Sequence, residues 1–295
     1  MVLNSLIKEN YRIKHPYYRL RLWLEGLHSK DKIVIYQMGK VGSTTIWKSL
    51  QSLNLNIPIY HIHSLNHERI RKAIETDQAN YRKLHFMYPE TLHSEYLRSQ
   101  LDRKNIVNPW SVITLVRDPI AKILSGFFQK LEGELLLGFD YRKKIKAEGD
   151  TKIVQEIIEG FYKERVENPS RIHPFEWFNF ELKDHLNVDL FAASTLAGRN
   201  YYIDNTKLAR VLWLKLESLN DSYQSAFKDF LGIQNFNLVQ ANVGLNKRYK
   251  NLYKIFLRNV NLPVDYLDNI YQTELVRHFY SKSEIEQFYQ RWKSY

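Results

Sequence analysis

The sequence contains no cysteine among its 295 residues. This absence excludes disulfide bonds, thiolate metal sites and a cysteine nucleophile. It is typical of proteins in reducing compartments, so we expect a cytoplasmic protein. The sequence also lacks any continuous apolar run long enough for a signal peptide or a membrane span.

Glycine and proline are scarce, with 11 and 8 residues, and they form no linker rich in Pro, Gly or Ser. No internal repeat is present. With 44% hydrophobic residues, the chain can enclose a sizeable core in one large domain or two small ones. We expect a single domain over residues 1–295.

Acidic residues are fewer than basic residues, and the net charge is +11. A basic surface attracts polyanions such as nucleic acid, anionic lipid or a phosphorylated cofactor. The basic residues are spread along the chain rather than concentrated in one tail, so nucleic acid is not the expected partner. We assign most of these charges to a solvated surface.

Four short segments predict strands, at 32–37, 57–62, 111–116 and 210–216. The first three are nearly continuous apolar runs, which is typical of strands covered on both faces. Strands that alternate with helices predict an α/β fold with a single doubly wound parallel sheet.

Apolar residues recur at helical spacing between these strands, over 120–131 and 153–161. The C-terminal third is helical, with a capping box expected at Ser283 and Glu286. Residues 130–190 carry no strand signal, so we expect a helical insertion there.

The segment QMGKVGSTT follows the first predicted strand and precedes a helix. Ligands of doubly wound sheets bind beyond the carboxyl ends of the strands, where this loop lies. Glycines let backbone N–H groups converge, and the following helix N-terminus favours an anion. Lys40 adds a positive charge and three hydroxyl residues follow. We predict a phosphate-binding loop formed by Gly39, Lys40, Val41, Gly42, Ser43, Thr44 and Thr45.

This loop is not a Walker A motif, in which the lysine follows the second glycine of GxxxxGK[ST]. Here Lys40 precedes Gly42 and the spacing is shorter. An ordinary strand-to-helix turn with hydroxyl caps is the alternative interpretation. The loop alone does not decide between the two.

The segment RDPIAKILSGF contains a second candidate anion site, at Arg117 and Ser125. Asp118 is placed to cap the next helix, and Pro119 suits its first position. An arginine fork and a serine hydroxyl can converge on one anion. The alternative is an arginine paired with a carboxylate and a surface serine. Two anion sites at the ends of neighbouring strands suit a ligand with two separate phosphates.

Together the two segments resemble the signature of sulfotransferases that use 3′-phosphoadenosine 5′-phosphosulfate (PAPS). GKVGSTT is similar to the loop that holds the 5′-phosphosulfate, with Lys40 at the family's loop lysine or arginine. RDPIAKILSGF is similar to the element that holds the 3′-phosphate, through Arg117 and Ser125. Lys122 stands where many members have arginine, and we interpret it as structural.

Later segments resemble the family more weakly. VLWLKLESL is similar to a late strand, and NVGLNKRYKNLY is similar to the basic segment that closes over the cofactor, here through Lys247 and Arg248. The order of the segments over roughly 32–255 is most similar to the bacterial branch of capsular polysaccharide synthesis proteins. The resemblance implies a P-loop NTPase-like sulfotransferase fold.

The resemblance implies an enzyme that transfers a sulfuryl group from PAPS to a hydroxyl of a glycan or polysaccharide. Lys40 and the loop N–H groups would stabilise charge on the leaving phosphate. The acceptor hydroxyl needs a general base. We favour His63, near the carboxyl end of the second strand, over His61 on the same face, which we expect to be satisfied in the packing. His85 is a weaker alternative.

No metal is expected. A sulfuryl group carries less charge than a phosphoryl group, and no carboxylate pair suited to Mg²⁺ follows a strand. The His-x-His pattern of His61 and His63 is that of a zinc pair, but the sequence offers no obvious third ligand.

Two other functions stay open. The first is a P-loop-like kinase, and the missing GK[ST] sequence and the missing carboxylate for Mg²⁺ argue against it. A non-catalytic nucleotide- or polyanion-binding protein is supported only by charge and by 14% aromatic content.

The basic N-terminal arm, residues 1–30, contains a segment at 11–27 that mixes basic residues with Tyr, Trp and Leu. We expect this segment to form a helix packed on the domain. A peripheral contact with the inner membrane or with a synthesis complex is the alternative. The arm and the 130–190 insertion are expected to shape the acceptor cleft, and neither indicates which glycan binds.

Overall fold

The computed structural model describes residues 11–27, 29–84, 88–104, 106–136, 149–169, 173–192, 195–239 and 250–293. The chain forms two compact units, each described by itself below. Unit 1 contains Met1–Leu115, Trp177–Ser194 and Asn200–Val239, and unit 2 contains Val116–Glu176, Thr195–Arg199 and Gln240–Tyr295. The single domain expected from the sequence stays a prediction.

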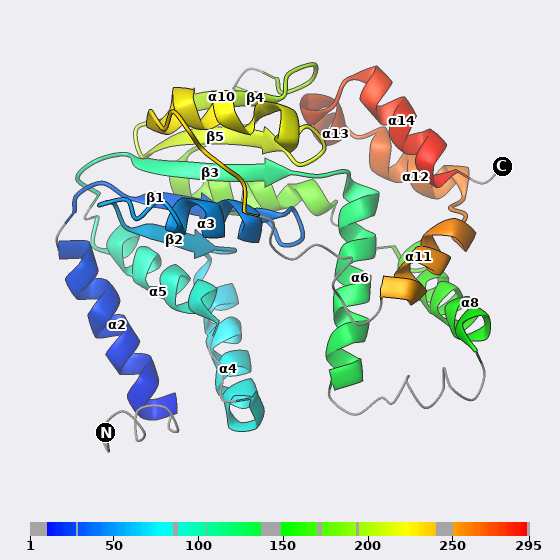
Figure 1. The fold of residues 1–295 in the computed structure, drawn as a ribbon, viewed down its shortest axis with the longest axis horizontal. Coiled ribbons are helices and arrows are strands. Elements are labelled where there is room, and N and C mark those ends of the chain that lie inside the picture. Colours follow the sequence, from blue (N-terminus) through cyan, green and yellow to red (C-terminus); the bar gives the residue numbers. More distant parts are fainter. Residues whose placement is uncertain are drawn as a thin grey trace. The chain divides into compact units, whose positions relative to one another are not determined.

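Unit 1 is built around a five-stranded, mostly parallel sheet in the order β2-β1-β3-β5-β4 (Figure 1). β1 runs parallel to both β2 and β3. The N–H of Trp110 donates to the carbonyl of Leu208 over 2.9 Å, so β3 and β5 begin at the same edge. Only β4 is described as antiparallel to its neighbour, β5. The strands are β1 (Ile33–Tyr36), β2 (Ile59–Ile62), β3 (Trp110–Val116), β4 (Tyr201–Asn205) and β5 (Ala209–Lys215).

All four predicted strands are confirmed, and β4 is the strand that the sequence did not reveal. Residues of β1 are fully buried, whereas those of β4 are half-buried or exposed. An exposed edge strand needs no continuous apolar run, so its sequence carries a weak signal.

Helices cover the sheet of unit 1. α3 packs on β1 and β2, α5 on β2, and α10 on β4 and β5 (Figure 1). The helices of this unit are α2 (Tyr11–Leu27), α3 (Ser43–Gln51), α4 (His67–Leu84), α5 (Pro89–Asp102), α9 (Asp184–Leu186) and α10 (Leu219–Leu231), with a π-helical turn at Asn179–Lys183.

The predicted helix in the N-terminal arm is confirmed as α2, and it packs on α5. Leu22 is buried, and Nε2 of His15 lies 3.0 Å from the Glu95 carboxylate. The opposite face exposes an apolar stripe of Ile13, Tyr17, Leu20, Trp23 and Leu24. A contact of this stripe with a membrane or a synthesis partner stays a prediction.

Unit 2 is mainly helical in the part that the structure describes. The expected 130–190 insertion is divided between the two units, because residues 177–190 belong to unit 1, and it stays a prediction as an insertion. Phe128, Phe161 and Phe256 pack edge to face in its core. The helices are α6 (Pro119–Leu136), α8 (Asp150–Phe161), α11 (Lys250–Asn259), α12 (Val264–Tyr271), α13 (Glu274–Phe279) and α14 (Lys282–Trp292), with a π-helical turn at Tyr162–Val166 and a 3₁₀ turn at Pro174–Glu176.

The capping box predicted for the last helix is wrong by two residues. α14 begins at Lys282, and its cap is Ser281. The Ser281 hydroxyl accepts from the N–H of Glu284, and the Glu284 carboxylate accepts from the N–H of Ser281. Both registers satisfy the Ser-x-x-Glu pattern, so the pattern alone did not fix the helix start.

No helix in the described ranges is both long enough and apolar enough to cross a membrane.

Candidate active site

The predicted phosphate loop lies between β1 and α3, and its backbone requires a glycine at position 42. Lys40 and Gly42 have φ angles of 72° and 84°, in the left-handed region. A Cβ on Gly42 would also lie 2.7 Å from Cδ1 of Leu216. Gly39 has no left-handed φ, and a Cβ there would meet nothing within 4 Å. Only one of the two glycines is therefore needed for the turn.

The N-terminus of α3 faces this loop without a side-chain cap. The N-cap residue is Gly42, which has no side chain to cap the helix. The carbonyl of Gly42 accepts from the N–H of Thr45 over 3.1 Å. The first amide groups of a helix favour an anion when no side chain satisfies them. Val41 is buried, while Thr44 and Thr45 are half-exposed beside Lys40. This geometry suits the predicted phosphate cradle.

The side chain of Gln37 contacts both the loop and the end of β2, a role that the sequence did not reveal. Its side-chain amide donates to Oγ of Ser43 over 2.8 Å and lies 3.0 Å from Nδ1 of His63. Its backbone carbonyl lies 3.1 Å from the same nitrogen. Nδ1 of His63 either accepts from this amide or donates to this carbonyl, and in the second tautomer the ring keeps its lone pair on Nε2.

His61 and His63 differ in surroundings, as expected. His61 is 2% exposed, and its Nε2 lies 2.9 Å from Oγ of Ser43, so the expected packing satisfies this nitrogen, whereas its buried Nδ1 makes no hydrogen bond. His63 is exposed, and its pKa is lowered, first by partial burial of the ring, then by His61, and to a smaller extent by Lys40. Lys40 and His63 therefore lie near enough to interact, and His63 is neutral at neutral pH.

Glu90, near the start of α5, is a third group beside the two histidines. Its Oε1 lies 3.3 Å from Nδ1 of His61. Burial alone would raise the pKa of Glu90, but His61 and His63 outweigh it and lower the pKa to about 2. One ligand atom each from His61, His63 and Glu90 lie within 4.8 Å of one another. Glu90 is thus the third potential metal ligand that the sequence did not reveal.

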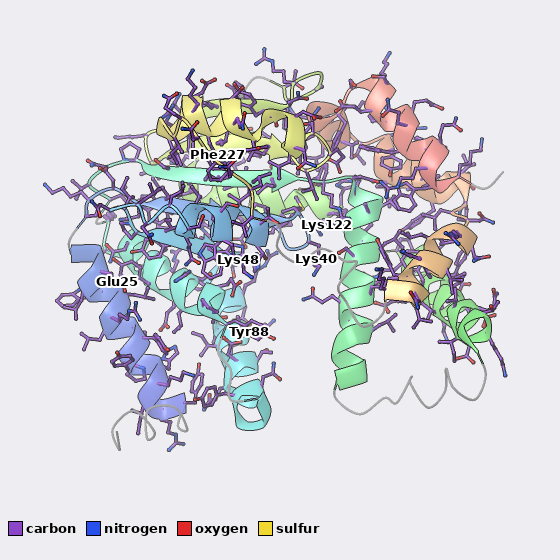
Figure 2. All side chains as sticks on the ribbon, viewed as in Figure 1. Glu25, Lys40, Lys48, Tyr88, Lys122 and Phe227 are labelled. Carbon is purple, nitrogen blue, oxygen red and sulfur yellow. The ribbon has the colours of Figure 1, made fainter. Side chains whose placement is uncertain are left out.

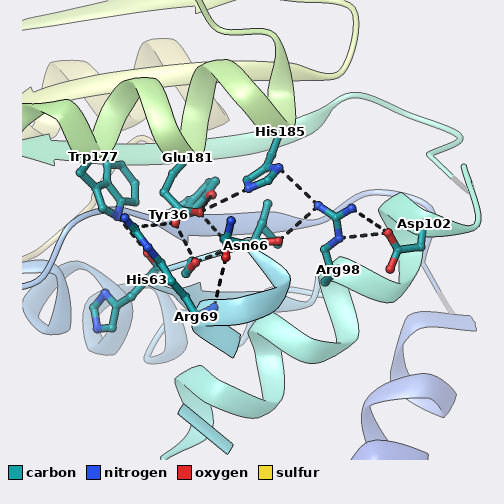
Figure 3. Close-up of polar contacts among 11 residues, drawn as sticks. Tyr36, His63, Asn66, Arg69, Arg98, Asp102, Trp177, Glu181 and His185 are labelled. Carbon is teal, nitrogen blue, oxygen red and sulfur yellow. Dashed lines mark hydrogen bonds and ion pairs between the residues drawn. The ribbon is translucent and has the colours of Figure 1, made fainter. Parts of the chain in front are cut away.

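A buried carboxylate, Glu181, holds the loop that follows β2 (Figure 3). Glu181 is fully buried and comes from the π-helical turn at 179–183. Its oxygens accept from four donors, which are the hydroxyl of Tyr36 (2.5 Å), the hydroxyl of Ser64 (2.7 Å), the N–H of Leu65 (2.8 Å) and Nη1 of Arg69 (2.9 Å). This carboxylate therefore fixes the chain that leaves β2 immediately after His63.

Trp177 fixes His63 from the same side. Its indole N–H donates to the carbonyl of His63 over 2.9 Å, and its ring packs edge to face on Tyr36 (Figure 3). Neither Trp177 nor Glu181 has a sequence signal for this role, because both reach the site from a helical segment distant in the chain. Their contacts position the backbone of His63.

The second predicted anion segment lies in unit 2, at the start of α6. Arg117 directly follows β3, and Oδ1 of Asp118 accepts from the N–H of Ile120 over 3.0 Å, which confirms the predicted cap. Arg117 and Ser125 are both half-buried. Burial lowers the pKa of Lys122 to about 8, with contributions from Arg165 and Arg117. Burial disfavours the charged form of Lys122 most, and the two arginines contribute less.

Three candidates, His85, Lys247 and Arg248, lie outside the described residues. Their proposed roles stay predictions.

Comparison with known proteins gives the class of this chain. The profile described as "Sulfotransferase family" matches residues 27–189, more than half of the sequence. The chain belongs to the sulfotransferase family, which confirms the resemblance seen in its two motifs and supports a transferase. A second profile, described as "Putative capsular polysaccharide synthesis protein", matches residues 143–281. No curated protein and no solved structure matches the chain.

Proposed function

We propose that this sulfotransferase-family protein transfers the sulfuryl group of PAPS to a hydroxyl of a glycan or polysaccharide, on a P-loop-like fold, in capsular polysaccharide synthesis. Family membership supports the transfer, and the second matching profile supports the glycan acceptor. The observation that carries the proposal is the arrangement in unit 1. A left-handed loop with Lys40 follows β1, and His63 follows the neighbouring parallel strand β2.

On the donor side, Lys40 and the first N–H groups of α3 meet the 5′-phosphosulfate. The bond between sulfur and the bridging oxygen breaks, and negative charge develops on the leaving phosphate. Fixed donors and a cation stabilise this charge more in the transition state than in the ground state. The 3′-phosphate is assigned to Arg117 and Ser125. Burial is the main cause of the low pKa of the neighbouring Lys122, and Arg165 and Arg117 add to it.

On the acceptor side, the glycan hydroxyl attacks sulfur and Nε2 of His63 takes its proton. The products are the sulfated glycan and 3′-phosphoadenosine 5′-phosphate. A neutral imidazole can accept a proton, and the lowered pKa of His63 keeps it neutral. Gln37 and Trp177 hold the ring and backbone of His63 in place.

The proposal is tested with Lys40→Ala and His63→Ala. His63→Ala should retain nucleotide affinity and lower turnover by on the order of 10²–10⁴, as is usual for a lost general base. Lys40→Ala should lower turnover and also weaken nucleotide binding, because the same charge meets the phosphate before reaction. The measurements are nucleotide affinity by calorimetry and sulfate transfer from PAPS to a glycan acceptor.

The matched control is Lys48→Ala, which removes an exposed lysine from α3, whereas Lys40 lies on the loop that precedes this helix (Figure 2). This control should behave as the wild type. Sulfate transfer by His63→Ala at the wild-type rate would show that His63 is not the base. Phosphoryl transfer from ATP with Mg²⁺, in place of sulfate transfer from PAPS, would support a kinase instead.

A further inference from the structure

His61, His63 and Glu90 bring three metal-binding groups together in unit 1. We propose that they form a binding site for a zinc-class divalent cation. The three ligand atoms lie within 4.8 Å of one another. Tetrahedral zinc, with bonds of about 2.0–2.1 Å, places neighbouring ligand atoms roughly 3.3–3.4 Å apart. Nδ1 of His61 and Oε1 of Glu90 already lie 3.3 Å apart.

The hydrogen bonds around the two histidines suit metal ligands. A metal-bound histidine usually donates its other ring N–H to a protein oxygen, which fixes the tautomer and the ring orientation. Nε2 of His61 lies 2.9 Å from Oγ of Ser43, and Nδ1 of His63 lies 3.1 Å from the carbonyl of Gln37. The side-chain amide nitrogen of Gln37 also lies 3.2 Å from Nε2 of His61 and 3.0 Å from Nδ1 of His63. Each ring therefore keeps a lone pair for a cation only in the tautomer in which these two ring nitrogens carry the proton.

Two buried polar atoms point to the same conclusion. Nδ1 of His61 and Oε2 of Glu90 are buried and make no hydrogen bond. A lone pair on Nδ1 and a carboxylate oxygen repel each other at 3.3 Å unless a proton or a metal cation lies between them. A proton on His61 is the competing explanation, and it predicts that zinc does not bind.

The ligand chemistry selects the class of metal. Two imidazoles and one carboxylate suit zinc and similar transition metals, whereas Mg²⁺ and Ca²⁺ prefer oxygen ligands. Three protein ligands leave the fourth position of a tetrahedral site open to water or to another ligand.

A bound cation would also regulate the enzyme, a consequence that rests on the proposed function. A lone pair of His63 that binds a metal cannot take a proton from the acceptor. Zinc should therefore inhibit sulfate transfer, and a chelator should restore it. The site is in this sense a metal-controlled switch on the general base.

The binding test uses the full, untagged chain after treatment with a chelator and dialysis. Zinc is titrated calorimetrically into the wild type, Glu90→Gln and Glu95→Gln. Glu95 is the matched control, because it lies on the same helix and pairs with His15 and Arg19 instead. We expect one zinc ion per chain in the wild type and the control, and at least tenfold weaker binding in Glu90→Gln. No saturable binding to the wild type, or equal binding to Glu90→Gln, would overturn the site.

Cobalt provides a test that does not depend on the folding of a variant. Co²⁺ added to the wild type should give the intense visible absorption of a four-coordinate ion, and zinc should displace it. Weak absorption, typical of six-coordinate cobalt, would contradict the proposed ligand set.

The regulatory consequence is measured separately, by sulfate transfer with and without zinc. Transfer that persists at saturating zinc would overturn inhibition while leaving the binding site in place. An absence of transfer in zinc-free protein would instead overturn the proposed function. The calorimetric result stands in either case, so the two failures are distinguishable.

Discussion

Individual residues decide the geometry of the candidate site, and they differ in how well the sequence revealed them. Lys40 and Arg117 each lie in a contiguous segment with a recognisable spacing of residues, so the sequence was sufficient to predict them as site residues. Gln37, Glu90 and Glu181 reach the site from separate elements. Their roles depend on tertiary contacts, which no local spacing encodes.

Gly42→Ala should disrupt the phosphate loop, because residue 42 has a left-handed φ and a Cβ would clash with Leu216. Left-handed backbone costs an L-residue roughly 1–2 kcal/mol, before any contribution from the clash. We therefore expect lower thermal stability and weaker nucleotide binding, measured by calorimetry. Gly39→Ala is the matched control, since a Cβ there meets open space. Equal effects of the two substitutions would contradict this account of the loop.

Glu181→Ala should lower the free energy of unfolding strongly, by about 3–5 kcal/mol, because it removes one partner of a buried network. The hydroxyl of Tyr36 and the N–H of Leu65 would lose their acceptor. Glu68→Ala is the control, since this exposed carboxylate pairs with Arg71 on the surface, where solvent screens the pair and its removal should change the stability little. Chemical denaturation measures both variants. A loss for Glu181→Ala no larger than that for Glu68→Ala would show that the network does not hold the loop.

The sequence predicted helices and strands correctly where burial requires a recognisable pattern of apolar residues. The covered strands β1, β2 and β3 have continuous apolar runs, and α6 and α8 have helical periodicity. β4 escaped because an edge strand needs little apolar surface, and the start of α14 was misplaced because two registers satisfy one capping pattern. The sequence thus indicated the α/β class and the loop positions, but not the edge of the sheet.

The helix α6 contains a lysine whose charge opposes folding at neutral pH. Burial, with Arg165 and Arg117, lowers the pKa of Lys122 from its ordinary 10.5 to about 8. Between these pH values the unfolded chain binds more protons than the folded chain. The contribution of Lys122 to the free energy of unfolding should therefore rise with pH over this interval.

Lys122→Met should accordingly raise the melting temperature relative to the wild type at about pH 7, and this gain should shrink towards about pH 10. Lys130→Met is the control, because Lys130 is an exposed lysine on the same helix. Scanning calorimetry at several pH values gives the comparison. A gain that is independent of pH would contradict the lowered pKa.

As a whole, this sulfotransferase-family chain is proposed to bind a nucleotide with two separate phosphates. The family follows from the match over residues 27–189. The proposed 3′-phosphate specificity rests on the resemblance at Arg117 and Ser125. The sequence was sufficient for this hypothesis because each anion segment is a continuous stretch of the chain. The choice of acceptor depends instead on surfaces that no sequence motif describes.

The most direct test is calorimetric titration with 3′-phosphoadenosine 5′-phosphate and with the same nucleotide lacking the 3′-phosphate. We predict that the wild type prefers the 3′-phosphorylated form, and that Arg117→Ala erases most of this preference, a loss of roughly 1.5–3 kcal/mol for a charged hydrogen bond. Arg103→Ala, which removes an exposed arginine next to α5, should keep the preference. Equal affinity of the wild-type protein for the two nucleotides would contradict the account.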